Sequence, residues 1–272
     1  MEKQIKLKNS DIDSLNRRLL ELNSVNKWFE LKLNSSIRFP LIDHVDISDH
    51  DIRIFIDVLN YVLVSIQDFV TVMIREMQST NWNIDQAVKS IEPNGVFDQS
   101  KYKCFVFESY VTREMFEGFG VKSDEDDKNG TDILEEDCTS SLAKFTRGKY
   151  MRLVHQKMEY SFNGNLGQRK MLNEWQFSLT TKFLGSFTEM ARRVWILRCL
   201  ALSFDEEVSV FRVSSGCRFS SVYIKNVVVN SSGGGGDWLP VAFTVVPGFK
   251  IGEKVVQSQV YLSPAGGSKN IA

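Results

Sequence analysis

Cysteine is scarce in this chain of 272 residues. The four cysteines lie far apart and form no Cys-x-x-Cys pair, which excludes a zinc knuckle and a thioredoxin-like redox site. They are Cys104, Cys138, Cys199 and Cys217. We expect reduced thiols in a cytosolic type of compartment. A chain of this length also buries a sizeable core without support from disulfides or metal.

A long hydrophobic run free of charges is absent as well. The most apolar stretch, Ile52–Ile74, contains Arg53, Asp57 and Asp68, and ionised groups at that density are too costly inside a hydrocarbon core. The N-terminal segment Met1–Lys8 is polar and lysine-rich, unlike a secretory signal. We therefore predict a buried core helix and no transmembrane segment. The expected location is the cytoplasm, and a nuclear or peripheral plasma-membrane pool is compatible with it.

Neither sign of charge is in excess, since 33 lysines and arginines face 34 aspartates and glutamates. This balance leaves no global basic field that would attract nucleic acid. One local cluster, formed by Arg192, Arg193 and Arg198 near Trp195, remains to be interpreted. Three arginines on one helix usually form a solvated outer face, and we adopt that interpretation. We predict no nucleic-acid partner.

Motifs of catalytic and cofactor sites are missing too. The sequence has no G-x-S-x-G elbow, no kinase-type loop and no H-E-x-x-H pair. The glycine run Gly233–Gly236 is followed by Asp237, whereas a phosphate loop requires a lysine and a serine or threonine at a helix start. We predict a flexible hairpin connection there. The expected protein has no catalytic residues, no cofactor and no bound nucleotide.

Three histidines are the remaining candidates for chemistry. His44 and His50 lie among aspartates, and two imidazoles beside carboxylates are able to hold a metal. Their spacing matches no recognised ligand motif, so we interpret this stretch as a polar helix entry without a metal. His155 has no nucleophile motif beside it, and we expect a structural role for it.

What the sequence does contain is mostly helical periodicity. Near the N-terminus, apolar residues recur every three or four positions from Ile12 to Leu33, with Asn26 in phase. This heptad pattern predicts a coiled-coil-like helix over residues 1–34 that forms a homo- or heterodimer through 10–34. A single amphipathic helix lying on the body of the protein is the alternative, because three heptads are too few to decide.

A helical domain is predicted over residues 35–204. Ser48 is the expected N-cap of the central core helix, and Asn83 with Gln86 forms a capping-box pattern before a short helix that ends ahead of Pro93. Acidic residues crowd the segment Lys122–Asp137, which predicts a disordered loop at 120–140. Three further helices are expected at Lys101–Phe119, Leu142–Tyr160 and Glu174–Leu202.

Short β-rich runs replace the helical pattern after Phe204. They predict a small β-rich subdomain at 205–264 and a disordered tail at 265–272. The candidate strands are Val208–Val213, Val241–Val246 and Lys254–Leu262. For Ser220–Val229 we choose a short helix over a strand. The expected fold is mainly α, a helical bundle with a small antiparallel β motif packed on helix 174–202, and α+β overall. An uncovered sheet edge would be the place for peptide binding by strand addition.

Several motifs are spread over the chain from residue 90 to residue 262. They are Ser90-Ile91-Glu92-Pro93, Tyr102, Phe107-Glu108-Ser109-Tyr110, Met115-Phe116, Lys149-Tyr150, Leu153–Glu159, Ser161–Arg169, Val194–Leu197, Leu200–Asp205, Phe211-Arg212-Val213, Gly216–Ser220, Phe243–Gly252 and Gln257–Leu262. Together they resemble a plant family named for the gravitropic-in-the-light protein and a related receptor-kinase-interacting protein.

The resemblance covers nearly the whole chain, from the family's central coiled coil through its C-terminal domain. Family members usually carry another helical domain before the coiled coil, so we expect a short paralogue or an incomplete gene model. The resemblance implies a non-enzymatic signalling adaptor linked to red and far-red light control of negative gravitropism. It also implies protein partners, among them a receptor-like kinase. A structural or trafficking-complex subunit is the alternative.

Overall fold

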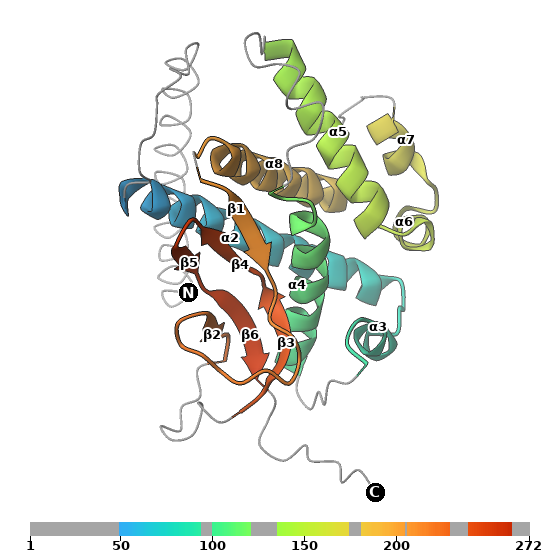
Figure 1. The fold of residues 1–272 in the computed structure, drawn as a ribbon. Helices are drawn as coiled ribbons and strands as arrows, with labels where there is room; N and C mark the ends of the chain where they lie inside the picture. The colour runs from blue at the N-terminus through green and yellow to red at the C-terminus, as the bar shows by residue number, and fades with distance from the viewer. Residues whose placement is uncertain are drawn as a thin grey trace, which may run out of the picture. The chain divides into compact units, whose positions relative to one another are not determined.

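The computed structural model describes residues 49–93, 100–120, 135–173, 181–204, 206–228 and 239–262 (Figure 1). The chain divides into two compact units, residues 1–45 and 46–272, and all described residues belong to the second. Several predicted features lie outside the described residues and stay predictions. These are the coiled-coil-like helix at 1–34, most of the acidic loop, His44, the glycine run at 233–236 and the tail at 265–272.

All described helices precede the strands along the chain. The helices are α2 (Asp49–Ser79), α3 (Ile84–Ile91), α4 (Ser100–Phe116), α5 (Glu135–Leu153), α6 (Gln156–Asn163), α7 (Gly167–Asn173) and α8 (Lys182–Leu202). The strands are β1 (Val208–Phe211), β2 (Ile224–Asn226), β3 (Val241–Val246), β4 (Gly248–Ile251), β5 (Lys254–Val256) and β6 (Ser258–Leu262). The predicted α+β class, mainly helical with a small β part at the C-terminal end, is confirmed.

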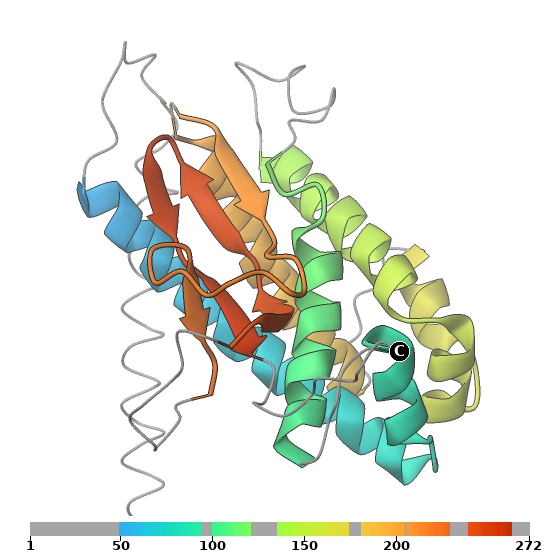
Figure 2. The ribbon, with the colours of Figure 1, turned by 60° about the horizontal axis from the view of Figure 1, so that its bottom comes forward.

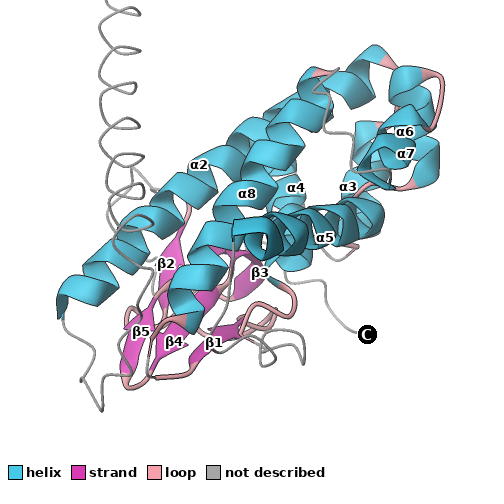
Figure 3. Ribbon diagram, turned by 90° about the horizontal axis from the view of Figure 1, so that it is seen from above, coloured by secondary structure: helices cyan, strands magenta, loops and turns pink. Residues whose placement is uncertain are grey.

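Helix α2 is the central core helix, as its periodicity predicts. Its apolar stripe is nearly inaccessible to solvent, and Phe69 packs on Phe183 and Phe187 of α8 with ring centroids 5.3 and 5.7 Å apart. Figure 3 shows α2 and α8 running alongside each other, with the strands on one side of the pair. The stretch Ile52–Ser79 is long and apolar enough to cross a membrane. Here its apolar face is buried in protein, while Asp57 and Asp68 are exposed.

Side-chain caps set the helix boundaries. Asn83 Oδ1 accepts a hydrogen bond from the Gln86 amide at 2.9 Å, which confirms the predicted start of α3. The single helix predicted over 142–160 is wrong, because His155 Nδ1 accepts from the Lys157 amide at 3.1 Å and starts a new helix. The helix predicted from residue 174 begins instead at Lys182, where the Thr181 hydroxyl caps it.

Two further predictions need correction. The loop expected at 120–140 ends earlier, since α5 already begins at Glu135. The short helix chosen for 220–229 is a turn followed by β2, which pairs in parallel with β6. The β-branched residues of that segment favour a strand over a helix, and the strand forms because β6 is available to pair with it.

The strands form two three-stranded sheets, in the orders β1-β4-β5 and β2-β6-β3, instead of the one antiparallel sheet expected (Figure 2). Strands β3 and β4 follow each other across Pro247, and β5 and β6 follow each other across Gln257. They therefore build one long hairpin whose two halves belong to different sheets. Its tip is Gly252-Glu253, and the φ of 56° at Gly252 suits the first position of a type II′ turn.

Helix α4, and not α8, holds the β part. The hydroxyls of Ser109 and Thr112 each donate to a β3 carbonyl, Thr244 O and Val245 O, at 2.6 Å. Arg212 Nη2 makes longer contacts of 3.4 Å with Ser109 Oγ and Thr244 O. An apolar stripe on α8 runs through Phe187, Val194 and Leu197. The predicted docking of the sheet on this α8 stripe is therefore wrong. That stripe is already covered by α2, so the sheet packs on the next available apolar surface.

Candidate functional site

Most motif residues that carry the family resemblance are used to hold the fold together. Glu159 is fully buried, and its carboxylate accepts from the Arg169 backbone amide at 2.7 Å and from Arg169 Nε at 3.2 Å. Arg169 Nη2 also donates to the Val154 carbonyl at 2.5 Å, and the Tyr150 hydroxyl donates to Gln168 at 3.0 Å. These groups join α5, α6 and α7, so they are positioned for stability and not for chemistry.

Lys149, another motif residue, caps a helix. Its Nζ donates to the carbonyls of Glu114 and Glu117 at 2.8 Å each, and these carbonyls belong to the C-terminal end of α4. Burial lowers the pKa of Lys149 to about 8, although the nearby Glu114 carboxylate opposes the shift. The lysine is thus held between α4 and α5 by backbone acceptors.

Of the residues weighed as functional candidates, His155 and the three arginines lie in the described part of the chain. His155 caps α6, as the structural interpretation expects. Arg192 and Arg193 pair with Glu189 at 2.9 and 2.7 Å. Arg198 is not on a solvated face: it is only 8% exposed, and its guanidinium lies 5.5 Å from the centre of the Trp195 ring. Among the described residues, no group of three or more histidines, cysteines, aspartates or glutamates is close enough to bind a metal.

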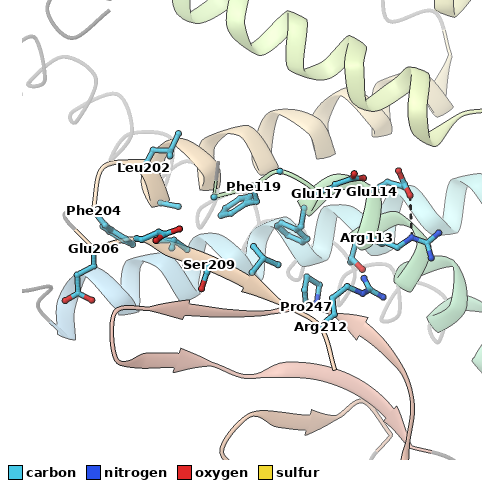
Figure 4. A pocket seen from close by; sticks show the side chains of 18 residues that line it. Arg113, Glu114, Glu117, Phe119, Leu202, Phe204, Glu206, Ser209, Arg212 and Pro247 are labelled. Carbon is cyan, nitrogen blue, oxygen red and sulfur yellow. Dashed lines mark hydrogen bonds and ion pairs between the residues drawn. The ribbon is translucent and has the colours of Figure 1, made fainter. Parts of the chain in front are cut away.

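A groove of about 990 Å³ opens on the surface of the described part. One wall is the end of α4 with the turn 117–120, the second is the end of α8 with Phe204, Glu206 and Glu207, and β1 runs along the bottom (Figure 4). Figure 4 places Glu206 at one end, Phe119 in the middle, and Arg113 with Arg212 at the other end. Its volume lies at the upper end of the range of ligand pockets, and its open shape also accommodates a peptide.

A cluster of aromatic rings packs beneath the groove. Phe116 and Phe119 lie with ring centroids 5.5 Å apart, and both contact Phe249 below them, at 5.3 and 5.5 Å. Phe55 of α2 packs on the other side of Phe249 at 5.3 Å and also contacts Phe204 at 6.1 Å. Edge-to-face packing of this kind fixes the rings. Because Phe55, Phe116, Phe119 and Phe249 are at most 3% exposed, they support the groove from below and offer a ligand little surface.

Charges on the α4 wall of the groove are neutralised in pairs. Glu114 lies 3.4 Å from Arg113 and 3.6 Å from Arg152, and Arg152 also contacts Glu117. Such half-exposed pairs contribute little to stability, but they leave this wall without a free charge of either sign. Sequence reasoning missed the groove, because its lining comes from three separate segments. The one local signal is Glu206-Glu207 directly before the apolar strand β1.

Glu108 lines a second, smaller cavity of about 230 Å³ between α2, α4 and the end of β3. Burial raises the pKa of its carboxyl from the ordinary 4.5 to about 7, although a hydrogen bond with Gln67 lowers it somewhat. The folded protein therefore binds more protons than the unfolded chain between these two pH values. Stability from protonated Glu108 is present below pH 4.5 and is lost as the pH rises to 7.

We expect Glu108→Gln to be more stable than the wild type at pH 7.5, by about 2 to 3 kcal/mol, and equal to it near pH 4.5. The amide keeps the shape of the carboxyl without its ionisation. Thermal melts of both proteins across this range measure the difference. The exposed Glu253→Gln is the matched control and should follow the wild type. A constant difference between Glu108→Gln and wild type would contradict the raised pKa.

Residues 210–261 match the model of the GIL1/IRKI C-terminal domain. The predicted family resemblance is confirmed. The matched segment runs from the second half of β1 to β6, so it includes one side of the groove.

The relative that matches is Protein GRAVITROPIC IN THE LIGHT 1 of Arabidopsis thaliana. The two sequences are 26% identical over 311 aligned residues, which cover 97% of this chain and 55% of the relative. The chain therefore spans about half the length of the curated relative. No solved structure matches the chain.

Proposed function

We propose that this chain is a non-enzymatic plant signalling adaptor that acts through protein–protein interaction. The proposal is carried by one contrast: the motif residues hold the fold together, whereas the groove is open to a ligand. Motif side chains such as Glu159, Arg169 and Lys149 are engaged in internal hydrogen bonds, while the open groove is lined by the edge strand β1 and is supported by a buried aromatic cluster. A preformed groove of this kind suits recognition of another protein.

The biological setting of the proposal comes from the resemblance. The relative is named for gravitropism in the light, so we place this chain in light-regulated gravitropic growth, including red and far-red control. A receptor-like kinase is the proposed partner class, and the cytoplasm is the proposed location. The gravitropic setting rests on the GIL1/IRKI domain and on the relative's name. The partner class comes from the resemblance of the sequence motifs, and the location from the separated cysteines and the polar N-terminal segment.

Recovery of partners from plant seedlings tests the proposal. The full chain, tagged at its C-terminus, is purified from light-grown and dark-grown tissue, and binding of each recovered candidate is then repeated with purified components. We expect kinases and growth regulators that bind directly. Vesicle or cytoskeletal complexes would favour the alternative, a structural or trafficking subunit. Turnover of a recovered small-molecule substrate by the pure chain would overturn the non-enzymatic assignment.

A further inference from the structure

We infer that the cavity beside Glu108 binds the guanidinium group of an arginine side chain that a protein partner inserts. The inference rests on the proposed function for the source of the arginine and goes beyond it by naming a site away from the groove. Only Thr112 lines both the groove and this cavity. Three observations carry the inference: a buried carboxylate without a cation, carboxamide groups around the same cavity, and an apolar rim on α2.

The Glu108 carboxylate is buried without a positive charge beside it. The residue is 8% exposed, and in the described part of the chain it forms no ion pair. Its side-chain hydrogen bond is with Gln67, a neutral amide that compensates little of the cost of burying a charge. The other buried glutamate of the described part, Glu159, is neutralised by Arg169, with Nε and Oε2 3.2 Å apart. Glu108 lacks such an arginine, and the cavity beside it has room for one.

Three carboxamide side chains belong to residues that line the same cavity, Asn60 and Gln67 of α2 and Gln259 of β6. Gln259 is paired in register with Val246 of β3, which also lines the cavity, so the sheet fixes its position. The side chains of Asn60 and Gln259 make no hydrogen bond to a described residue, so their oxygens are available as acceptors. A guanidinium has five N–H donors, and a carboxylate with neutral oxygen acceptors near it satisfies more of them than a carboxylate alone.

The size and the rim of the cavity suit one long side chain. Its volume of about 230 Å³ is below the range of roughly 300–1,000 Å³ that is typical of pockets for drug-sized ligands. Leu63 and Val64 border it on α2, and Val64 is 40% exposed. The aliphatic stem of an arginine would cover this apolar surface while the guanidinium reaches Glu108. A small cation without such a stem would leave the rim uncovered, which favours a side chain of a partner.

Binding at this cavity depends on pH through Glu108. Burial raises the pKa of its carboxyl to about 7, and the residues that line the cavity from α2, β3 and β6 are uncharged. On α4 itself the titratable neighbour is Cys104, whose thiol pKa is raised by burial and by Glu108, so the thiol stays neutral. A guanidinium favours the ionised carboxylate, and the affinity therefore increases as the pH rises through 7.

The compound N-acetyl-arginine methylamide tests the cavity, and the corresponding citrulline compound, a neutral isostere, is its control. Binding to the full chain at pH 8 is followed through the methyl NMR signals of Leu63 and Val64. We expect a dissociation constant on the order of millimolar for the arginine compound and binding about tenfold weaker for the citrulline compound. At pH 6 the arginine compound should bind about tenfold more weakly than at pH 8, because Glu108 is then mostly protonated. Absence of shifts, or equal affinity of the two compounds, overturns guanidinium binding.

The variant Glu108→Gln removes the charge and keeps the shape of the side chain. It should weaken binding of N-acetyl-arginine methylamide at pH 8 by about tenfold and abolish the difference between pH 6 and pH 8. Because this variant is expected to be more stable than the wild type at that pH, unfolding does not explain the loss. Glu253→Gln, in the β4–β5 turn away from the cavity, is the matched control and should bind as the wild type does. Wild-type affinity in Glu108→Gln would overturn the role of the carboxylate.

Recovery of partners from seedlings separates this inference from the proposed function. The wild-type chain and Glu108→Gln are compared in the same experiment. If the wild type recovers directly binding partners that Glu108→Gln loses, the arginine comes from a partner protein. Equal recovery by both chains overturns a partner as the source while the adaptor function stands. Recovery by neither chain overturns the adaptor function and, with it, a partner as the source.

Discussion

Replacing Arg169 by methionine is expected to lower the free energy of unfolding by about 3 to 5 kcal/mol. The carboxylate of Glu159 is fully buried, and its ion-pair partner in the structure is Arg169, with Nε and Oε2 3.2 Å apart. The variant would leave that charge buried with the backbone amide of residue 169 and the Tyr150 hydroxyl as its remaining donors. It would also leave the Val154 carbonyl, at the junction of α5 and α6, without the guanidinium.

Urea unfolding followed by circular dichroism measures this change, and Arg192→Met is the matched control. Arg192 pairs with Glu189 at 2.9 Å, but both side chains are more than two-fifths exposed. Its loss should cost less than about 1 kcal/mol, because water screens exposed pairs. A loss of stability in Arg169→Met as small as in the control would show that the buried carboxylate finds another partner or a proton.

Phe249→Ala is expected to destabilise the protein by about 3 to 5 kcal/mol. Phe249 has no exposed surface and contacts aromatic rings from two helices, Phe55 of α2 and Phe116 of α4. Truncation removes the ring contacts and leaves a cavity where the sheet meets the helices. The same change should loosen the floor of the groove, since Phe119 also rests on this ring.

Thermal melting measures the effect, with Tyr223→Ala as the control on the same β part. Tyr223 is 51% exposed and makes only a distant ring contact with Phe211, at 6.4 Å. We expect a small change in melting temperature for the control and a loss of roughly 10 °C for Phe249→Ala. Similar losses in the two variants would mean that the aromatic cluster does not anchor the sheet.

Local signals in the sequence were sufficient to predict a helix or strand wherever that element is specified by residues close to one another in the chain. The apolar periodicity of residues 52–77 predicts α2, and Asn83 with Gln86 predicts the start of α3. The run Val241–Val246 predicts β3 residue for residue. Each of these elements is specified by side-chain spacing or by a cap, and both can be read without knowing which surface the element will meet.

The candidate site could not be predicted from local patterns in this way. The aromatic cluster beneath it joins Phe55, Phe119, Phe204 and Phe249, which lie in four separate parts of the chain. The position of β1 at the edge of its sheet follows only from its pairing with β4 alone. The expected strand addition at an uncovered edge stays a prediction, and at Val208 the β1 edge is covered by the turn after α4.

By itself, then, the sequence determined the α+β class, the core helix, the main strand and the family resemblance, because these follow from local pattern and from motifs. Tertiary structure alone decided that β2 pairs in parallel with β6, that the β part packs on α4, and that Glu108 is buried. The reason is that pairing and burial depend on which apolar surfaces remain uncovered after the others have packed. The α8 stripe was taken by α2, so the sheet met the hydroxyls of Ser109 and Thr112, and the groove formed where the two packings meet.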